Sequence, residues 1–191
     1  MVLISEIAEL KSGTPQFRIV EDSSACAPLY FFYSQVNLED DLRGLSTNHV
    51  PSKQIRTFDS VITTSSGDVV FSLLSGTAAM VRSEHSGYLL TQNYVVLASS
   101  QRVDPRYLVY LINENQHIRY QLRMSQQGSV TLKYSLRQLR SLEIPSLPSQ
   151  ERQRRIGELY LDQMKLDALR KRASELETSL VLAEIREADQ S

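Results

Sequence analysis

The sequence has few of the features that mark several large classes of protein. Cys26 is the only cysteine, which excludes an internal disulfide and a thiolate zinc cluster. No run approaches the ~18–20 apolar residues of a membrane-spanning helix. The start at Met1 lacks the basic stretch and long apolar core of a signal peptide. From these absences we expect a cytoplasmic protein that is not bound to a membrane.

The motifs of common active sites are also missing. The histidines His49, His85 and His117 are scattered, and none is paired at metalloprotease spacing. The sequence has no Gly-rich phosphate loop, dinucleotide fingerprint, methyltransferase motif or restriction-nuclease constellation, and its Ser-Gly pairs lack the flanks of a nucleophile elbow. The acidic run 39–41 is interpreted as a solvated loop. We expect no catalytic residue, no cofactor and no metal, although a small enzyme with an unrecognised site stays an alternative.

The charge is distributed unevenly along the chain. The net charge of −1 argues against nucleic acid as a partner, because nucleic-acid binders usually carry a basic surface. Residues 102–140, however, hold seven Lys and Arg against two acids, a balance of +5. Salt screens charges beyond ~8–10 Å, so the local potential decides phosphate attraction. The basic stretch is therefore either a DNA-facing surface or a solvated basic face.

The first hundred residues predict a short helix followed by strands. Leu3, Ile7 and Leu10 have helical spacing, and Gly13 is placed to end that helix. The aromatic run 28–36 predicts a buried strand, and 37–60 an irregular polar segment. Short β-type runs separated by turn residues then predict several strands. These runs are 61–63, 69–71, 78–81 and 94–97.

Helix signals dominate after residue 103. Asp104 is a good N-cap and Pro105 suits the first position of a helix. Ser135 predicts the cap of a second, short helix. Residues 144–148 must be extended, because two prolines three apart do not fit inside a helix.

The last forty residues predict one long helix with a seven-residue repeat. From 149 to about 188 there is no proline and one glycine, among strong helix formers. One row of the repeat is Leu159, Leu166, Ala173 and Leu180, and the other is Asp162, Leu169, Leu176 and Ala183. This a/d pattern is typical of a coiled coil. The alternative is a terminal helix that packs back on its own domain.

Four segments, in this order, carry a resemblance to a known family. They are 3–15 with its Gly-Thr-Pro, 67–81 with its Gly-Asp-hydrophobic strand, 104–111, and 128–156 with Pro148 and a Gln-x-x-Ile at its end. Together they resemble the specificity subunits of type I restriction-modification systems. The family's Glu-Gln pair is replaced here by Arg152-Gln153, and one recognition unit is present where a full subunit has two.

The resemblance implies an α+β protein with two parts. Residues 1–148 would form a mixed β-sheet target-recognition domain with short flanking helices, and 149–191 a long C-terminal coiled-coil helix. The implied function is sequence-specific recognition of double-stranded DNA, with catalysis in separate methyltransferase and restriction subunits. The chain would be a natural half-subunit that dimerises or a piece of a longer protein. A competing hypothesis is an assembly protein that recruits a partner through its helix and never binds DNA.

Polar residues in small-residue turns are the candidates for DNA contact, because backbone and side chains approach phosphates there. Gln suits adenine, while Lys and Ser suit guanine or phosphate. The candidates are Gln126, Gln127, Ser129, Thr131 and Lys133, then Arg82, Gln92 and Asn93. We expect Gln127 and Lys133 to be exposed; the alternative is that all are ordinary solvated loop residues. The candidates for dimerisation are Leu159, Leu166, Leu169, Ala173, Leu176, Leu180 and Ala183.

Overall fold

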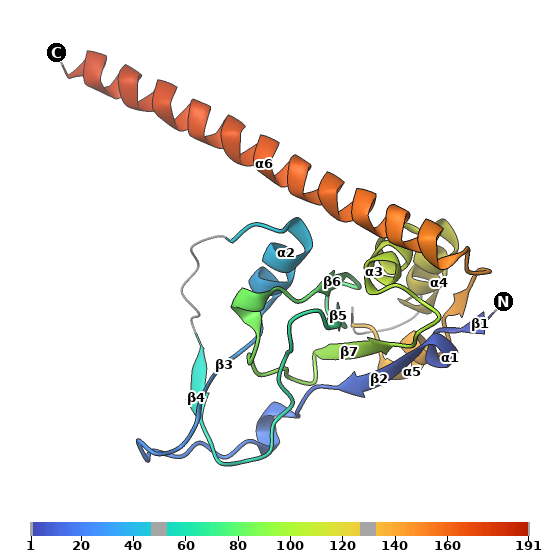
Figure 1. Ribbon diagram of the computed structural model, residues 1–191. Helices are drawn as coiled ribbons and strands as arrows, with labels where there is room; N and C mark the ends of the chain where they lie inside the picture. Colours follow the sequence, from blue (N-terminus) through green and yellow to red (C-terminus); the bar gives the residue numbers. More distant parts are fainter. Residues whose placement is uncertain (1, 47–52, 127–132, 191) are drawn as a thin grey trace.

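The computed structural model describes residues 2–46, 53–126 and 133–190. A small mixed domain carries one long helix that extends well past it (Figure 1). In chain order the elements are β1 (Val2–Leu3), α1 (Ile4–Ile7), β2 (Ala8–Ser12), η1 (Gln16–Arg18), β3 (Leu29–Phe31), α2 (Gln35–Arg43), β4 (Gln54–Arg56), β5 (Val69–Ser72), β6 (Ala78–Met80), η2 (Ser83–His85), β7 (Tyr94–Ser99), α3 (Pro105–Glu114), α4 (Gln116–Gln126), α5 (Leu136–Arg140), β8 (Glu143–Ile144) and α6 (Gln150–Asp189). The expected fold class, a mixed helix-and-sheet domain followed by a long C-terminal helix, is confirmed.

The centre of the domain is an antiparallel sheet of four strands in the order β2-β7-β5-β6. Side chains alternate between the two faces of a strand, and here both faces are covered. Val69 and Phe71 belong to the larger core, which α1, α3, α4 and α5 complete. Val70 points into a smaller core with Tyr33 and Leu38. Burial on both faces explains why this strand is apolar without interruption.

Two predicted helix starts are confirmed by their caps. The Asp104 carboxylate accepts hydrogen bonds from the backbone N–H of Arg106 and Tyr107, at 2.9 and 3.3 Å. Ser135 caps α5 and forms a reciprocal capping box with Gln138. Side-chain oxygens satisfy N–H groups that otherwise have no partner at a helix start, so these local signals are dependable.

The predicted N-terminal helix is wrong beyond its first turn. It ends at Ile7, and the next five residues form β2, in which Leu10 pairs with Leu97 of β7. Strand pairing with a partner far along the chain overrides the helical spacing. Gly13 does not end a helix. A Cβ atom built there would lie 2.2 Å from the carbonyl oxygen of Thr91, so glycine is required for close approach of two backbones.

The interpretation of residues 28–60 also needs correction. Strand β3 is short, it pairs with β4 in a sheet of two strands, and Leu29 is exposed rather than buried. Residues expected to be irregular form α2, which Ser34 caps together with Asn37. The acidic run lies on this helix and is not a solvated loop. Asp41 is buried and accepts hydrogen bonds from several elements that the sequence gave no reason to bring together.

The buried polar cluster around Asp41 links α2 to η2 and to Tyr33, which follows β3. Its carboxylate accepts from the hydroxyl of Tyr33 at 2.7 Å, lies 2.7 Å from Nδ1 of His85, and accepts from the backbone N–H of Arg82 at 3.1 Å. The other ring nitrogen of His85 lies 3.1 Å from the amide nitrogen of Asn37. Burial and then the nearby Asp41 carboxylate raise the pKa of Tyr33 well above its ordinary value. Mutual hydrogen bonding makes this burial tolerable.

Helix α6 begins where the sequence predicts and packs on α3 through its first turns. The side chain of Gln153 is buried, accepts from the N–H of Asp104 at 2.9 Å and donates to the carbonyls of Arg102 and Pro148. One turn later, a Cβ built on Gly157 would lie 2.6 Å from the backbone nitrogen of Tyr107. The helix therefore approaches α3 at backbone distance. Within the described residues, no helix has the length and apolar character to span a bilayer, α6 included.

Candidate nucleic-acid interface

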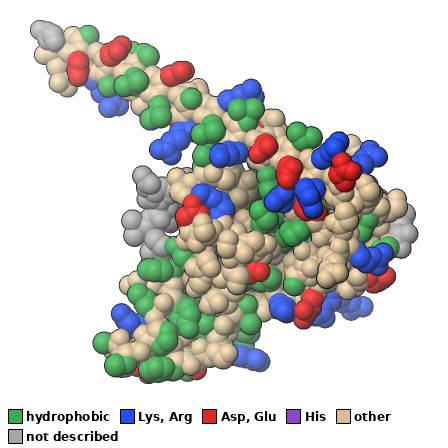
Figure 2. All heavy atoms as spheres, viewed as in Figure 1, with side chains coloured by type: hydrophobic (Ala, Val, Ile, Leu, Met, Phe, Trp, Pro, Cys, Tyr) green, Lys and Arg blue, Asp and Glu red, His purple; other side chains and the backbone are tan. Residues whose placement is uncertain are grey.

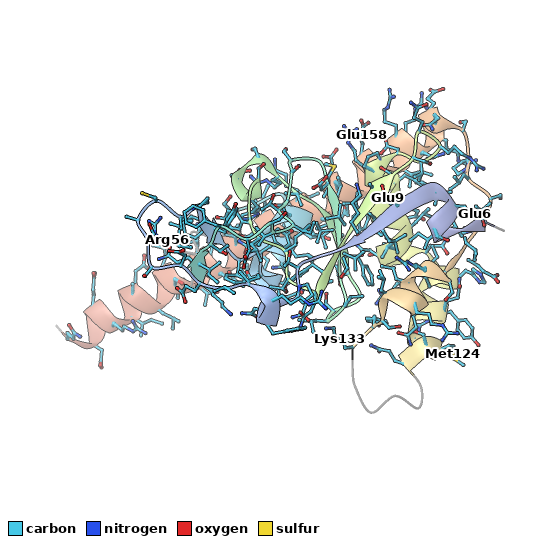
Figure 3. All side chains as sticks on the ribbon, turned by 90° about the horizontal axis from the view of Figure 1, so that it is seen from below. Glu6, Glu9, Arg56, Met124, Lys133 and Glu158 are labelled. Atoms are coloured by element: carbon cyan, nitrogen blue, oxygen red, sulfur yellow. The ribbon has the colours of Figure 1, made fainter. Side chains whose placement is uncertain are left out.

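Two of the predicted DNA-contact segments meet in the structure. The ammonium group of Lys133 donates to Oδ1 of Asn93 at 2.6 Å, although the two residues are forty positions apart. The neighbouring Gln92 accepts from the backbone N–H of Gln16 at 3.0 Å. In the view of Figure 3, Lys133 and Glu158 of α6 lie at opposite edges of the domain. Lys133 and Asn93 therefore lie on one surface of the domain, away from α6.

Backbone hydrogen bonds join four segments at this place. The N–H of Leu73 donates to the carbonyl of Asn93, and that of Tyr134 to the carbonyl of Leu73, both at 2.8 Å. The N–H of Gly13 donates to the carbonyl of Tyr94 at 3.0 Å. We call residues 13–18, 72–76, 91–94 and 133–134 the loop cluster. Its turns are fixed to one another and to the entry of β7.

The charge of the loop cluster suits a polyanion. Its segments contain Arg18 and Lys133 and no Asp or Glu, in a chain whose net charge is −1. A cationic surface attracts phosphates through its local potential, whatever the charge of the whole protein. Arg18 and Gln16 were not among the predicted contacts. The Gly-Thr-Pro before them carried part of the family resemblance and was not interpreted as a DNA contact.

The other predicted DNA-contact residues of the segment 126–133 differ in how far the structure describes them. Gln127, Ser129 and Thr131 lie outside the described residues. Gln126 is the last residue of α4 and is half-buried. Lys133 is also half-buried, where we expected exposure, because its ammonium group is held by Asn93.

Arg82 does not join the loop cluster. Strand register places it beyond the Val69 end of β5, while Asn93 lies beyond the opposite end, near Ser72. Its guanidinium forms an ion pair with Glu84, on the side of the domain that faces α6. The structure therefore separates Arg82 from Asn93 and Lys133, which lie together.

The basic stretch 102–140 is not a single patch. Arg106 forms a 2.6 Å ion pair with Glu158 of α6, and Arg119 donates to the carbonyl of Gly76 at 2.7 Å. Together with Lys133, these cations bond within the fold. Four others are exposed: Arg102, Arg123, Arg137 and Arg140. The count made on the sequence overstated the charge available to a partner.

The leucines of the heptad repeat face away from the domain. The face of α6 that contacts the domain includes Gln153, Gly157, Tyr160 and Ala168. At about 100° per residue, the a/d positions lie on the far side of the helix. Their exposed fractions run from 41% at Leu166 to 70% at Leu159. The first half of the helix packs on its own domain through a different face, and the coiled-coil interpretation of the leucine rows stays a prediction.

Helix α6 runs on past the domain, and Lys171, Arg172 and Glu175 still line a pocket with Asp40 and Arg43 of α2. Every residue from Leu169 to Gln190 is exposed, and hydrophobic side chains follow this protruding part in Figure 2. Leu176 and Leu180 are 55% and 65% exposed. A row of exposed leucines at seven-residue spacing is what an unpaired coiled-coil helix presents.

The polar groups of the buried cluster around Asp41 bond to one another. Both ring nitrogens of His85 are occupied, one by Asp41 and the other by Asn37. Titratable groups that only satisfy each other hold elements together, whereas an active site leaves a group aimed into a cavity. In the part of the chain that the structure describes, no cluster of three or more His, Cys, Asp or Glu side chains is arranged to hold a metal ion.

The fold is that of type I restriction-modification specificity subunits, a sheet-based domain followed by a long helix. The HsdS subunit from Thermoanaerobacter tengcongensis matches 90% of this chain with a TM-score of 0.55 and 20% identity. A chain from a structure on the complex assembly and conformational transition of a type I R-M system matches 96% with a TM-score of 0.60 and 19% identity.

This chain covers 39% and 42% of the length of those two proteins, so it corresponds to less than half of each. No protein-family model matches the sequence, and a comparison with curated protein sequences gives no match. At these identities the likeness shows a shared fold.

Proposed function

We propose that the chain is the DNA-recognition half of a type I restriction-modification specificity subunit. The observation that carries this proposal is the shared fold over at least 90% of the chain, helix included. Residues 1–148 are the target-recognition domain and 149–191 the spacer and dimerisation helix. The protein acts in the cytoplasm as a non-catalytic subunit, and directs separate methyltransferase and restriction subunits to a DNA sequence.

The loop cluster is the surface proposed to contact DNA. In this proposal Lys133 and Arg18 contact phosphates, and the neighbouring Gln92 and Asn93 are the candidates for bonds to base edges. Gln126, Gln127, Ser129 and Thr131 stay candidates from the adjoining segment. Arg82 is the weakest candidate, because it lies at the other end of the sheet.

The exposed leucine row on α6 is the proposed dimerisation surface. Two antiparallel helices would bury both rows and place the recognition domains at opposite ends of the spacer. The length of the helix would then fix the gap between two half-sites, as protein geometry does in other two-fold DNA complexes.

Selection from a random duplex library tests the proposed function. We expect the recovered DNA to contain two short motifs separated by a constant gap. As a control, the double variant Leu166→Glu/Leu176→Glu should keep single half-sites and lose the constant gap, because it separates the protomers. If no sequence is enriched although the protein is folded, the result contradicts the proposed function. It then favours the competing hypothesis of an assembly protein that acts through its helix.

A further inference from the structure

Phe17 is the most exposed large apolar side chain of the described residues, with an exposed fraction of 80%. A fully exposed phenylalanine forgoes the ~1.5–3 kcal/mol that its burial would provide. Isolated exposed apolar residues are common on protein surfaces. Phe17, however, occupies a defined place, because it stands in η1 within the loop cluster.

The backbone on both sides of Phe17 is firmly held. The N–H of Thr14 donates to the carbonyl of Leu90 at 2.8 Å, and the N–H of Arg18 to the carbonyl of Pro15 at 2.9 Å. The N–H of Gln16 donates to the side chain of Gln92 at 3.0 Å. These bonds fix the position of η1, and the Phe17 side chain extends from it into solvent. This is what a side chain that must enter a ligand requires.

The neighbours of Phe17 are cationic and polar. The guanidinium carbon of Arg18 lies 5.6 Å from the centroid of the Phe17 ring. Gln92 connects η1 to Asn93 and so to Lys133. A second apolar residue, Leu74, is 48% exposed on the turn that is bonded to Asn93. The loop cluster thus combines apolar side chains with positive charge and has no acid.

We propose that Phe17 is a wedge that enters the base stack of bound duplex DNA beside the phosphate contacts of Arg18 and Lys133. This inference rests on the proposed function. Proteins that bend DNA insert Phe, Leu or Ile between base steps and offset the lost stacking with added backbone contacts. Flexible pyrimidine–purine steps yield most easily, so a wedge also discriminates between sequences without bonding to a base.

The test compares an intact duplex of about three helical turns with the same duplex carrying a central two-base bulge. The bulge is already unstacked, so a wedge no longer has to separate the bases. We expect the wild-type protein to bind the bulged duplex about tenfold more tightly than the intact one, at equal salt. Phe17→Ala should abolish this preference but keep the salt dependence, and Phe17→Leu should retain most of it.

Phe58→Ala is the matched control, because Phe58 is a phenylalanine that is 65% exposed and lies outside the loop cluster. It should behave as wild type. Equal affinity of the wild-type protein for both duplexes, or a preference that survives Phe17→Ala, overturns the wedge and leaves the proposed function standing. No binding to either duplex at low salt counts against the wedge and the proposed function together.

Discussion

At the scale of single residues, the bond between Lys133 and Asn93 is the most informative contact for function. It fixes a lysine at the edge of the loop cluster with its charge retained, because an amide oxygen is a neutral acceptor. A fixed cation loses less conformational entropy on meeting a phosphate than a mobile one.

Lys133→Ala should therefore weaken binding to all duplexes to a similar degree and lower the slope of log K against log salt by about one. Fluorescence anisotropy over a salt series measures both effects. Arg140→Ala removes an exposed cation on α5, outside the cluster, and serves as the control. An unchanged slope in Lys133→Ala would remove this lysine from the interface.

The hydroxyl of Tyr33 gives a prediction about stability. Tyr33→Phe deletes its 2.7 Å bond to the buried Asp41 carboxylate and should lower the free energy of unfolding by about 1.5–3 kcal/mol. Tyr30→Phe removes a hydroxyl from a half-buried ring of the neighbouring strand and should change it far less. Urea denaturation gives both values. If Tyr33→Phe is no less stable than Tyr30→Phe, the buried cluster does not hold α2 in place.

At the scale of elements, the crossing of α6 over α3 depends on Gly157. Alanine is normally favoured over glycine inside a helix by about 1 kcal/mol. Here the added Cβ would lie 2.6 Å from the backbone of Tyr107, so the helices must separate. We expect Gly157→Ala to lower the free energy of unfolding by about 1–3 kcal/mol. Helix propensity alone would predict the opposite, a stabilised protein.

Thermal unfolding of Gly157→Ala beside Ser174→Ala tests this prediction, because Ser174 is exposed on the same helix. A stabilised Gly157→Ala protein would show that α6 is not tightly docked on α3.

The helices and strands also show which parts of the fold could be predicted from the sequence. The caps Asp104 and Ser135 were predicted because a cap needs only neighbours within one turn. The end of α1 and the presence of α2 were missed. Strand β2 exists because β7 lies beside it, and α2 buries Asp41 against Tyr33 and His85. No local pattern contains those partners.

At the scale of the whole molecule, the exposed leucine row predicts an oligomer. The isolated chain should be a two-fold homodimer, paired antiparallel through 150–187, with Leu159 near Ala183 of the second copy. Each leucine that becomes buried contributes about 1.5–3 kcal/mol. Light scattering at micromolar concentration should give twice the chain mass of 21.7 kDa.

Leu166→Glu with Leu176→Glu should convert this dimer into a monomer while the recognition domain stays folded, since both side chains are exposed and face away from it. Glu175→Gln with Glu177→Gln, two exposed positions on the same stretch, is the control. A dimer that survives the leucine substitutions would place the interface elsewhere.

The sequence by itself determined the features that depend on near neighbours: the capped helices, the apolar strand around Val70, and the heptad repeat of α6. The tertiary structure alone decided which of these features meet. It joined Lys133 to Asn93, separated both from Arg82, and turned the leucines of α6 away from the domain. The physical reason is the distance along the sequence over which each kind of interaction acts. Caps and periodicity act over three or four residues, whereas a binding surface is formed by backbone pairing and burial between residues that are distant in sequence.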